Sequence, residues 1–148
     1  MRLTPKAIPS IARDSIAALM VDRDVEIETM RISDAEMDLS AIMREYLANE
    51  ERVSTATREA LARRGLDESA FERVQREMAD VRGFKTGEAG IDDLIDQMVE
   101  FLLISRNVEE VFAGDGELRA KLRAVMLRHL EAGAGPEDSV SGAGPLGP

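Results

Sequence analysis

The sequence contains no cysteine and no tryptophan among its 148 residues, and only one tyrosine and four phenylalanines. Without cysteine the chain can form no disulfide, no thiolate nucleophile and no zinc–thiolate site. With aromatic residues at 3% and hydrophobic residues at 44%, the buried side chains must be mainly aliphatic. Alanine and straight-chain residues favour helices, whereas β-branched and aromatic residues favour strands. The composition therefore favours a helical protein with an aliphatic core.

Long apolar segments are absent as well. Charged residues interrupt the apolar segment 8–21, so the N-terminal region contains no signal-peptide core. The longest apolar stretch, residues 98–104, contains Glu100 and is far shorter than the roughly 20 residues that a membrane-spanning helix needs. We therefore expect a cytoplasmic protein that does not contact a membrane.

Positive charge is the scarcer sign. The chain has 19 lysines and arginines against 29 aspartates and glutamates, which gives a formal net charge of −10. Such a surface repels nucleic-acid phosphates and anionic lipids at long range, and it favours basic partners. We expect a protein partner or self-association, and we expect nucleic acid to be disfavoured.

The sequence does contain apolar residues at helical spacing, separated by helix start and stop signals. Ser33–Glu36 has the pattern of a capping box, and Gly65 and Gly83 are placed as left-handed C-caps. The polar run Asn49–Arg52 predicts a break, with Ser54 capping the next helix. We predict six helices, over residues 5–21, 33–48, 54–64, 67–82, 91–106 and 115–132. The residues expected to be buried on the fourth helix are Phe71, Val74, Met78 and Val81.

The two ends of this helical region resemble each other. A shift of 83 positions aligns residues 11–49 with residues 94–132 without a gap and gives eight identities in 39 positions. Amphipathic helices share apolar positions by chance, but the matched run of Arg23–Glu26 and Arg106–Glu109 lies between helices. The alignment therefore predicts an internal repeat.

The repeat suggests how the helices are arranged. We predict an all-α domain over residues 1–132, a compact six-helix bundle in which two pseudo-symmetric helix pairs are joined by a central pair. Val25–Ile27 alternates briefly between apolar and polar residues. If this segment and its counterpart Val108–Glu110 are extended, we expect them to pair across the pseudo-axis.

The single histidine is the first candidate for catalytic or metal-binding chemistry. His129 lies in the last turn of the sixth predicted helix, where the helix dipole favours a positive charge. No cysteine can join it as a ligand, and Met126 stands where a Glu-x-x-His metal motif requires glutamate. We therefore predict a structural role for His129.

Acidic residues are the second candidate. Asp92, Asp93 and Asp96 lie near the predicted start of the fifth helix. They could hold a hard cation, but acidic residues in a first turn also complement the helix dipole, and no EF-hand spacing is present. The sequence also lacks phosphate-loop, dinucleotide-binding and nucleophile-elbow motifs. We therefore predict no metal, no cofactor and no catalytic residue. Glu36, Asp38 and Glu45 are interpreted as a solvated helix face.

Arginines are densest in the segment 51–82. A pair of helices that carries such arginines could contact nucleic acid. The same segment, however, holds seven positive and seven negative charges, a balance typical of ion pairs on a helix surface. The arginines considered for a nucleic-acid contact are Arg58, Arg63, Arg64, Arg73 and Arg76.

Short motifs within residues 1–84 point to a known family. They are Met1-Arg2-Leu3, Pro9, Ile11-Ala12-Arg13 and Val25-Glu26, then Glu51-Arg52-Val53-Ser54, Arg58-Glu59 and Leu61, and finally Phe71, Met78-Ala79 and Arg82-Gly83. In these motifs the chain resembles the uncharacterised bacterial proteins of domain-of-unknown-function family 507. The resemblance implies a small helical bacterial protein, and it assigns no activity and no catalytic residue.

Two classes of function remain in view. The leading hypothesis is a non-catalytic helical module that binds another protein or a second copy of itself. The alternative is a nucleic-acid-associated regulatory protein that uses the helices around residues 55–82. We expect no enzymatic activity, because no group of residues has catalytic spacing.

The composition changes from Gly133 to Pro148, where glycine and proline make up eight of the last 16 residues. Such a segment cannot form an apolar helical stripe, and we predict that it is a disordered tail. A chain truncated after Ala132 should keep nearly its full thermal stability when its melting is followed by circular dichroism. A large loss of stability would show instead that the tail docks on the helices.

Overall fold

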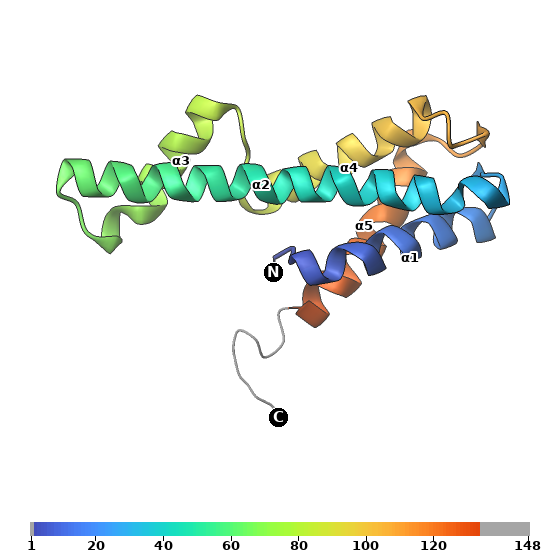
Figure 1. Cartoon of the computed structure of the whole chain (residues 1–148), viewed down its shortest axis with the longest axis horizontal. Helices are drawn as coiled ribbons and strands as arrows, with labels where there is room; N and C mark the ends of the chain where they lie inside the picture. The colour runs from blue at the N-terminus through green and yellow to red at the C-terminus, as the bar shows by residue number, and fades with distance from the viewer. Residues whose placement is uncertain (1, 134–148) are drawn as a thin grey trace.

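The computed structural model describes residues 2–133, and the side chains among them as far as Leu130. Within this range the chain forms five α-helices and a two-stranded ribbon (Figure 1). The elements are α1 (Ile8–Val21), β1 (Val25–Glu26), α2 (Ile32–Arg64), α3 (Phe71–Arg82), α4 (Gly87–Ile104), β2 (Glu110–Val111) and α5 (Asp115–Gly133), with 3₁₀ turns at Pro5–Ala7, Thr29–Arg31 and Glu68–Ala70. The predicted all-α class is confirmed. The predicted disordered tail lies outside the described residues, except for Gly133 at the end of α5.

Helix α2 runs without interruption through the predicted break at Asn49–Arg52. Its 33 residues replace the second and third predicted helices, so the prediction of six helices was wrong for the described part of the chain. The helix continues because this segment contains neither glycine nor proline, and its side chains bond within the helix. Arg52 Nη1 donates to Asn49 Oδ1 at 2.6 Å, and the buried Thr57 hydroxyl donates to the Val53 carbonyl at 2.7 Å.

One large aliphatic core lies among α1, α4, α5 and the first half of α2, which together form the body of the molecule (Figure 1). Burying an aliphatic side chain of this kind stabilises a fold by roughly 1.5–3 kcal/mol, so this core holds the body together. No helix described between residues 2 and 133 combines the length and the apolar character needed to cross a membrane. The largest fully buried side chains are Ile8, Ile11, Ile16, Leu19, Leu39, Met43, Leu94, Ile95, Met98, Leu102, Leu118 and Leu122.

The second half of α2 continues beyond the body and packs against α3 (Figure 1). We call this part, residues 51–82, the arm. The predicted compact bundle with a central pair covering the body was therefore wrong, because the two helices of the arm bury their apolar faces against each other. Val81, predicted to be buried, is 81% exposed. The small separate core of the arm consists of Ala60, Leu61, Ala70 and Val74, with Phe71 and Met78 packed against it.

A two-stranded antiparallel ribbon closes one end of the body core. Val25 in β1 stands opposite Val111 in β2, and Glu26 stands opposite Glu110. The expected pairing is confirmed, although β2 begins only at the last residue of the predicted segment. Val25 is buried among the core residues, so the ribbon is anchored to the body.

Glycine ends two of the helices as predicted. Gly65 and Gly83 have φ angles of 66° and 68°, and they stand directly after α2 and α3. The capping box predicted at Ser33–Glu36 is not formed, because α2 begins one residue before it. Ser54, predicted to cap a new helix, lies in the middle of α2.

The two halves of the predicted repeat have matching helix ends. The 83-residue shift carries the last residue of α1 onto the last residue of α4, and the first residue of α2 onto the first residue of α5. The same shift also relates two polar contacts, each between a helix residue and a residue in the segment that links two helices. Lys121 bonds Asp24, and at the corresponding positions Asn107 donates to Asp38 at 2.7 Å. Shared ancestry of the halves stays a prediction.

Leu19 and Leu102 correspond in the 83-residue register, and both are fully buried. Replacing either one with alanine should lower the free energy of unfolding by about 2–5 kcal/mol, because each change leaves a cavity in a packed core. The two losses, measured by urea denaturation, should be similar. Val81→Ala, at an exposed position, serves as the control and should change stability little. A small loss at only one of the two leucines would contradict their equivalence.

Candidate interaction surface

Large apolar side chains are exposed mainly at one end of the body, where α1 and α4 finish and α2 and α5 begin (Figure 1). We call residues 21–38 and 103–117 the ribbon end, since β1 and β2 lie within it. Six of the eight large hydrophobic residues exposed among residues 2–130 belong to it. They are Val21, Met30, Met37, Leu103, Ile104 and Phe112, with exposed fractions from 48% to 81%.

Hydrogen bonds hold the segments of the ribbon end together. The backbone N–H of Phe112 donates to the carbonyl of Asp24 at 2.8 Å, which joins the segment after β2 to the segment after α1. The guanidinium of Arg31 donates to the carbonyl of Arg106 at 2.9 Å and joins the turn that carries Met30 to the segment after α4. The exposed apolar side chains therefore come from segments that are fixed to one another.

The ribbon end also carries most of the excess negative charge of the chain. It contains eleven carboxylates and three arginines, a net charge of −8, while the whole chain has −10. Lys121, in the second turn of α5, bonds both Asp22 and Asp24, so the net charge of the ribbon end together with this lysine is −7. Exposed apolar side chains are thus combined with strong negative charge. The carboxylates are Asp22, Asp24, Glu26, Glu28, Asp34, Glu36, Asp38, Glu109, Glu110, Asp115 and Glu117.

Two of these carboxylates stand directly opposite each other in the ribbon. Glu26 and Glu110 form a cross-strand pair, and both are exposed. Like charges placed directly opposite in an antiparallel pair destabilise it. This part of the negative charge therefore opposes the fold.

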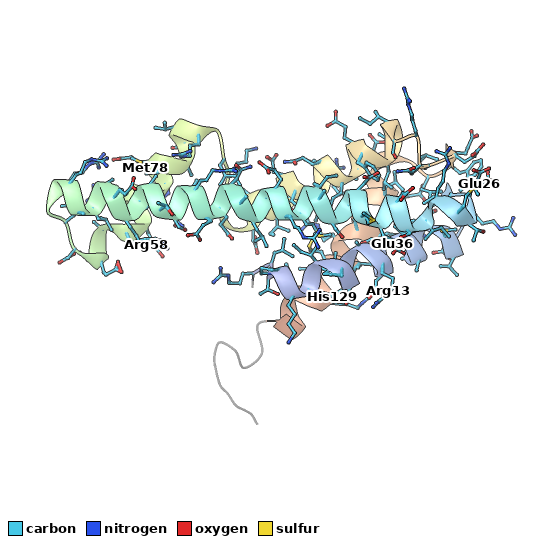
Figure 2. All side chains as sticks on the ribbon, viewed as in Figure 1. Arg13, Glu26, Glu36, Arg58, Met78 and His129 are labelled. Carbon is cyan, nitrogen blue, oxygen red and sulfur yellow. The ribbon has the colours of Figure 1, made fainter. Side chains whose placement is uncertain are left out.

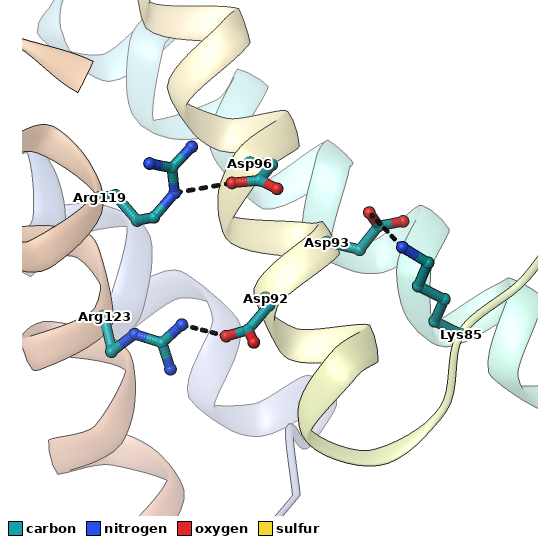
Figure 3. A network of polar contacts seen from close by, with 6 residues as sticks. All are labelled: Lys85, Asp92, Asp93, Asp96, Arg119 and Arg123. Atoms are coloured by element: carbon teal, nitrogen blue, oxygen red, sulfur yellow. Dashed lines mark hydrogen bonds and ion pairs between the residues drawn. The ribbon is translucent and has the colours of Figure 1, made fainter. Parts of the chain in front are cut away.

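The three aspartates considered as a metal site turn to different partners (Figure 3). Because α4 begins at Gly87, they lie beyond its first turn, and the interpretation through the helix dipole was wrong. Among residues 2–130 no three carboxylate or histidine side chains gather as metal ligands, and the absence of a metal stays a prediction. Two of the ion pairs join α4 to α5, and the third joins α4 to the link before it. The pairs are Asp92–Arg123, Asp96–Arg119 and Asp93–Lys85.

His129 joins the last helix to the first. Its Nε2 lies 2.8 Å from Oδ2 of Asp14, so the imidazole N–H donates to the carboxylate. This hydrogen bond lowers the pKa of Asp14 below its usual value, and Arg13 acts in the same direction. The contact spans 115 positions of sequence, which is why helix periodicity did not reveal it. It supports the structural role predicted for His129, which stays a prediction.

The arginines of the arm do not form one network. Arg64 pairs with Glu77 across the arm at 2.9 Å. Figure 2 shows Arg58 on the arm and Glu26 near the opposite end of the molecule. A nucleic-acid role for the arm stays a prediction, and the balance of charge along it does not favour one. The other considered arginines, which are exposed and form no ion pair with another described residue, are Arg58, Arg63, Arg73 and Arg76.

The sequence did not predict that apolar side chains are exposed at the ribbon end. Except for Met37 in the second turn of α2, its apolar residues lie in the last turns of helices or in links. An apolar stripe therefore does not distinguish Val21 or Ile104 from core residues. One signal was available. Phe112 belongs to no predicted apolar stripe, and it closes the sequence Glu109-Glu110-Val111-Phe112, which contains two carboxylates. An apolar residue between helices and next to carboxylates is a sign of exposure.

A comparison with protein families gives one match. The sequence model of a family described as "Protein of unknown function (DUF507)" matches residues 1–142. The match includes both halves of the body, whereas the motifs that carry the resemblance lie within residues 1–84. No curated protein matches the chain.

Removing one charge from the ribbon should stabilise the protein. Glu110→Gln should raise the free energy of unfolding by about 0.2–1 kcal/mol in low salt, because it relieves the repulsion from Glu26. The gain should shrink in high salt, where surface charges are screened. Glu109→Gln is the matched control, since Glu109 is exposed, directly precedes β2 and does not stand opposite Glu26 in the ribbon. Urea denaturation that shows the same change for both variants would contradict the cross-strand repulsion.

Proposed function

The chain belongs to the DUF507 family, and we propose that it is a non-catalytic module that binds another protein. The ribbon end holds a basic, amphipathic helix of the partner against its exposed apolar side chains. The observation that carries this proposal is the coincidence of six exposed apolar residues and a net charge of −8 at one end of the body.

The exposed apolar side chains provide the attraction. Large contiguous apolar patches are unusual on monomeric proteins and often mark interaction sites. Val21 and Ile104 are each 76% exposed, and burying such a side chain fully contributes roughly 1.5–3 kcal/mol. Met30 and Met37 add unbranched side chains that can adapt to the surface of a partner.

The charge selects the kind of partner. Nucleic acid and anionic membranes are repelled by this surface. A second copy of the chain that docked through the same surface would bring two acidic surfaces within the screening distance of about 8 Å. A segment rich in lysine and arginine is attracted instead, and its apolar face covers the exposed side chains.

The shape of the ribbon favours a helix as the partner element. Each strand of the ribbon has only two residues, which is too short an edge for an added strand. A helix needs no backbone partner, because its own N–H and C=O groups are already bonded, and it presents its apolar side chains along one face.

The repulsion between Glu26 and Glu110 supports the same proposal. A neutral residue at either position would relieve the repulsion, so the stability of the fold does not require both charges. A basic partner helix uses them, because its cations lie between the two carboxylates and replace repulsion with attraction.

We also propose that the body arose by duplication of a helix–strand–helix unit. The matching helix ends and the two corresponding polar contacts support this proposal. Duplication accounts for the equivalent positions of Val21 and Ile104, so the proposed binding surface contains one residue of this kind from each half.

A synthetic helix tests the binding proposal. A fluorescein-labelled peptide of lysine and leucine, about five turns or 18 residues long with leucine on one face, should bind the full chain in a fluorescence anisotropy titration. Ile104→Gln and Phe112→Gln should each weaken binding by about tenfold, because each removes an exposed apolar contact. Val81→Gln is the matched control on the arm and should leave the affinity unchanged.

Two peptides of matched length separate this interaction from general attraction. A peptide with the same composition but scattered leucines should bind much more weakly, and a glutamate–leucine helix should not bind. Equal weakening by Ile104→Gln and Val81→Gln would show that the ribbon end is not the site. Sedimentation that shows a dimer dissociated by Ile104→Gln would identify a second copy as the occupant and would overturn the proposal.

A further inference from the structure

A pocket of about 450 Å³ lies where α2 leaves the body and enters the arm. We call it the junction pocket. Its walls come from α2, from the end of α3 and the link that follows, and from the first turns of α4. Its volume falls within the range of small-molecule sites, about 300–1,000 Å³. Most of its lining side chains are polar or charged, so the pocket suits a polar ligand.

The junction pocket is locally positive on a strongly acidic chain. Arg52, Arg82 and Lys85 line it, against the two carboxylates Glu45 and Asp93. Lys85 Nζ lies 3.8 Å from Asp93 Oδ1, which is too long for a hydrogen bond (Figure 3). Arg82 forms no ion pair with any residue whose side chain the structure describes. Arg82 is therefore unpaired among the described side chains, and Lys85 is held only by this long ion pair, so both are available to an anion.

The only tyrosine of the chain contributes a hydrogen-bond donor to the same pocket. Tyr46 packs against Phe84 with ring centroids 5.3 Å apart, and only 7% of the residue is exposed. Burial, together with the charge of Glu50, raises the pKa of Tyr46 to about 12, so the phenol keeps its proton at neutral pH. Its hydroxyl forms no hydrogen bond with another described residue. Because Tyr46 lines the pocket and its hydroxyl has no partner among the described residues, the hydroxyl can donate to a ligand bound there.

Gly90 allows the walls of the pocket to approach one another. A Cβ atom at this position would lie 2.8 Å from the Tyr46 hydroxyl and closer still to the Lys85 carbonyl. Any other residue would therefore displace the tyrosine or the link, so the glycine preserves the arrangement of donor and cations.

We propose that the junction pocket binds a small organic anion, whose carboxylate or phosphate group pairs with Arg82 and Lys85 and accepts a hydrogen bond from Tyr46. A cationic ligand is disfavoured, because the three positive side chains outnumber the two carboxylates of the lining. An apolar ligand is disfavoured, because the polar walls would lose water without gaining hydrogen bonds. The bound anion links the arm to the body, since Arg82 belongs to α3 whereas Tyr46 belongs to the body part of α2.

The single tyrosine makes the test specific. The full chain labelled with ¹³C-tyrosine gives one set of ring signals, which report on this pocket alone. Citrate, inorganic phosphate and adenosine monophosphate are titrated separately at constant ionic strength. At least one of them should shift the Tyr46 signals to saturation, and comparing them distinguishes a carboxylate ligand from a phosphate ligand. If none of the three gives a saturable shift, the proposal is wrong.

Two arginine variants separate binding in the pocket from the effect of net charge. Arg82→Gln removes a pocket cation at an exposed position, and Arg63→Gln removes the same charge from the far end of the arm. Both variants should keep the circular dichroism spectrum of the parent. Arg82→Gln should weaken binding by about tenfold or more, as expected for loss of a hydrogen bond between charged groups, while Arg63→Gln should leave it unchanged. Equal weakening by both would overturn the proposal.

Discussion

The rest of the molecule depends on the continuity of α2, because this one helix takes part in both hydrophobic cores. Its first half buries Leu39 and Met43 in the body, and its second half buries Ala60 and Leu61 in the arm. Between the two lies a polar stretch that tertiary packing does not hold on every side. It stays helical because its residues are good helix formers and bond to one another. At 33 residues α2 is about 50 Å long, so it places the arm well beyond the body.

Charge is distributed unevenly between the arm and the ribbon end. The arm is electrically balanced, whereas the ribbon end carries a net charge of −8 together with most of the exposed apolar side chains. Negative charge around apolar residues hinders self-association, because two such surfaces repel each other before the apolar groups meet. The same charge attracts a basic partner. The exposed apolar side chains are thus combined with charge that opposes their association with a second copy of the same surface.

Residues at corresponding positions of the two halves differ in their contacts. Tyr46 and His129 correspond in the 83-residue register, and they belong to α2 and α5. His129 has a carboxylate partner within the chain, Asp14. Tyr46 instead faces the junction pocket, where Gly90 leaves room for its hydroxyl. The half that continues into the arm therefore keeps a donor that faces the pocket, whereas in the other half the corresponding residue joins the last helix to the first.

The sequence by itself determined the helical class, the aliphatic core and the points at which glycine ends a helix. These features depend on neighbouring residues alone: apolar spacing fixes a buried face, and Gly65 and Gly83 adopt a backbone conformation that other residues avoid. It also indicated the ribbon, because the register of the repeat brought two alternating segments into correspondence. It did not determine the number of helices, since a polar stretch without glycine or proline looks the same in a loop and in an exposed helix.

Only the tertiary structure decided which apolar residues are exposed, and which charges are paired. Val21 and Val81 belong to helical stripes and are nevertheless exposed, because the body ends at one and the arm is too thin to cover the other. The aspartates of α4 lie within five residues of sequence but have separate contacts, because their partners come from α5 and from the link before α4. The junction pocket likewise combines residues from three helices. Contacts of this kind depend on how helices pack, and a one-dimensional pattern contains no information on packing between distant segments.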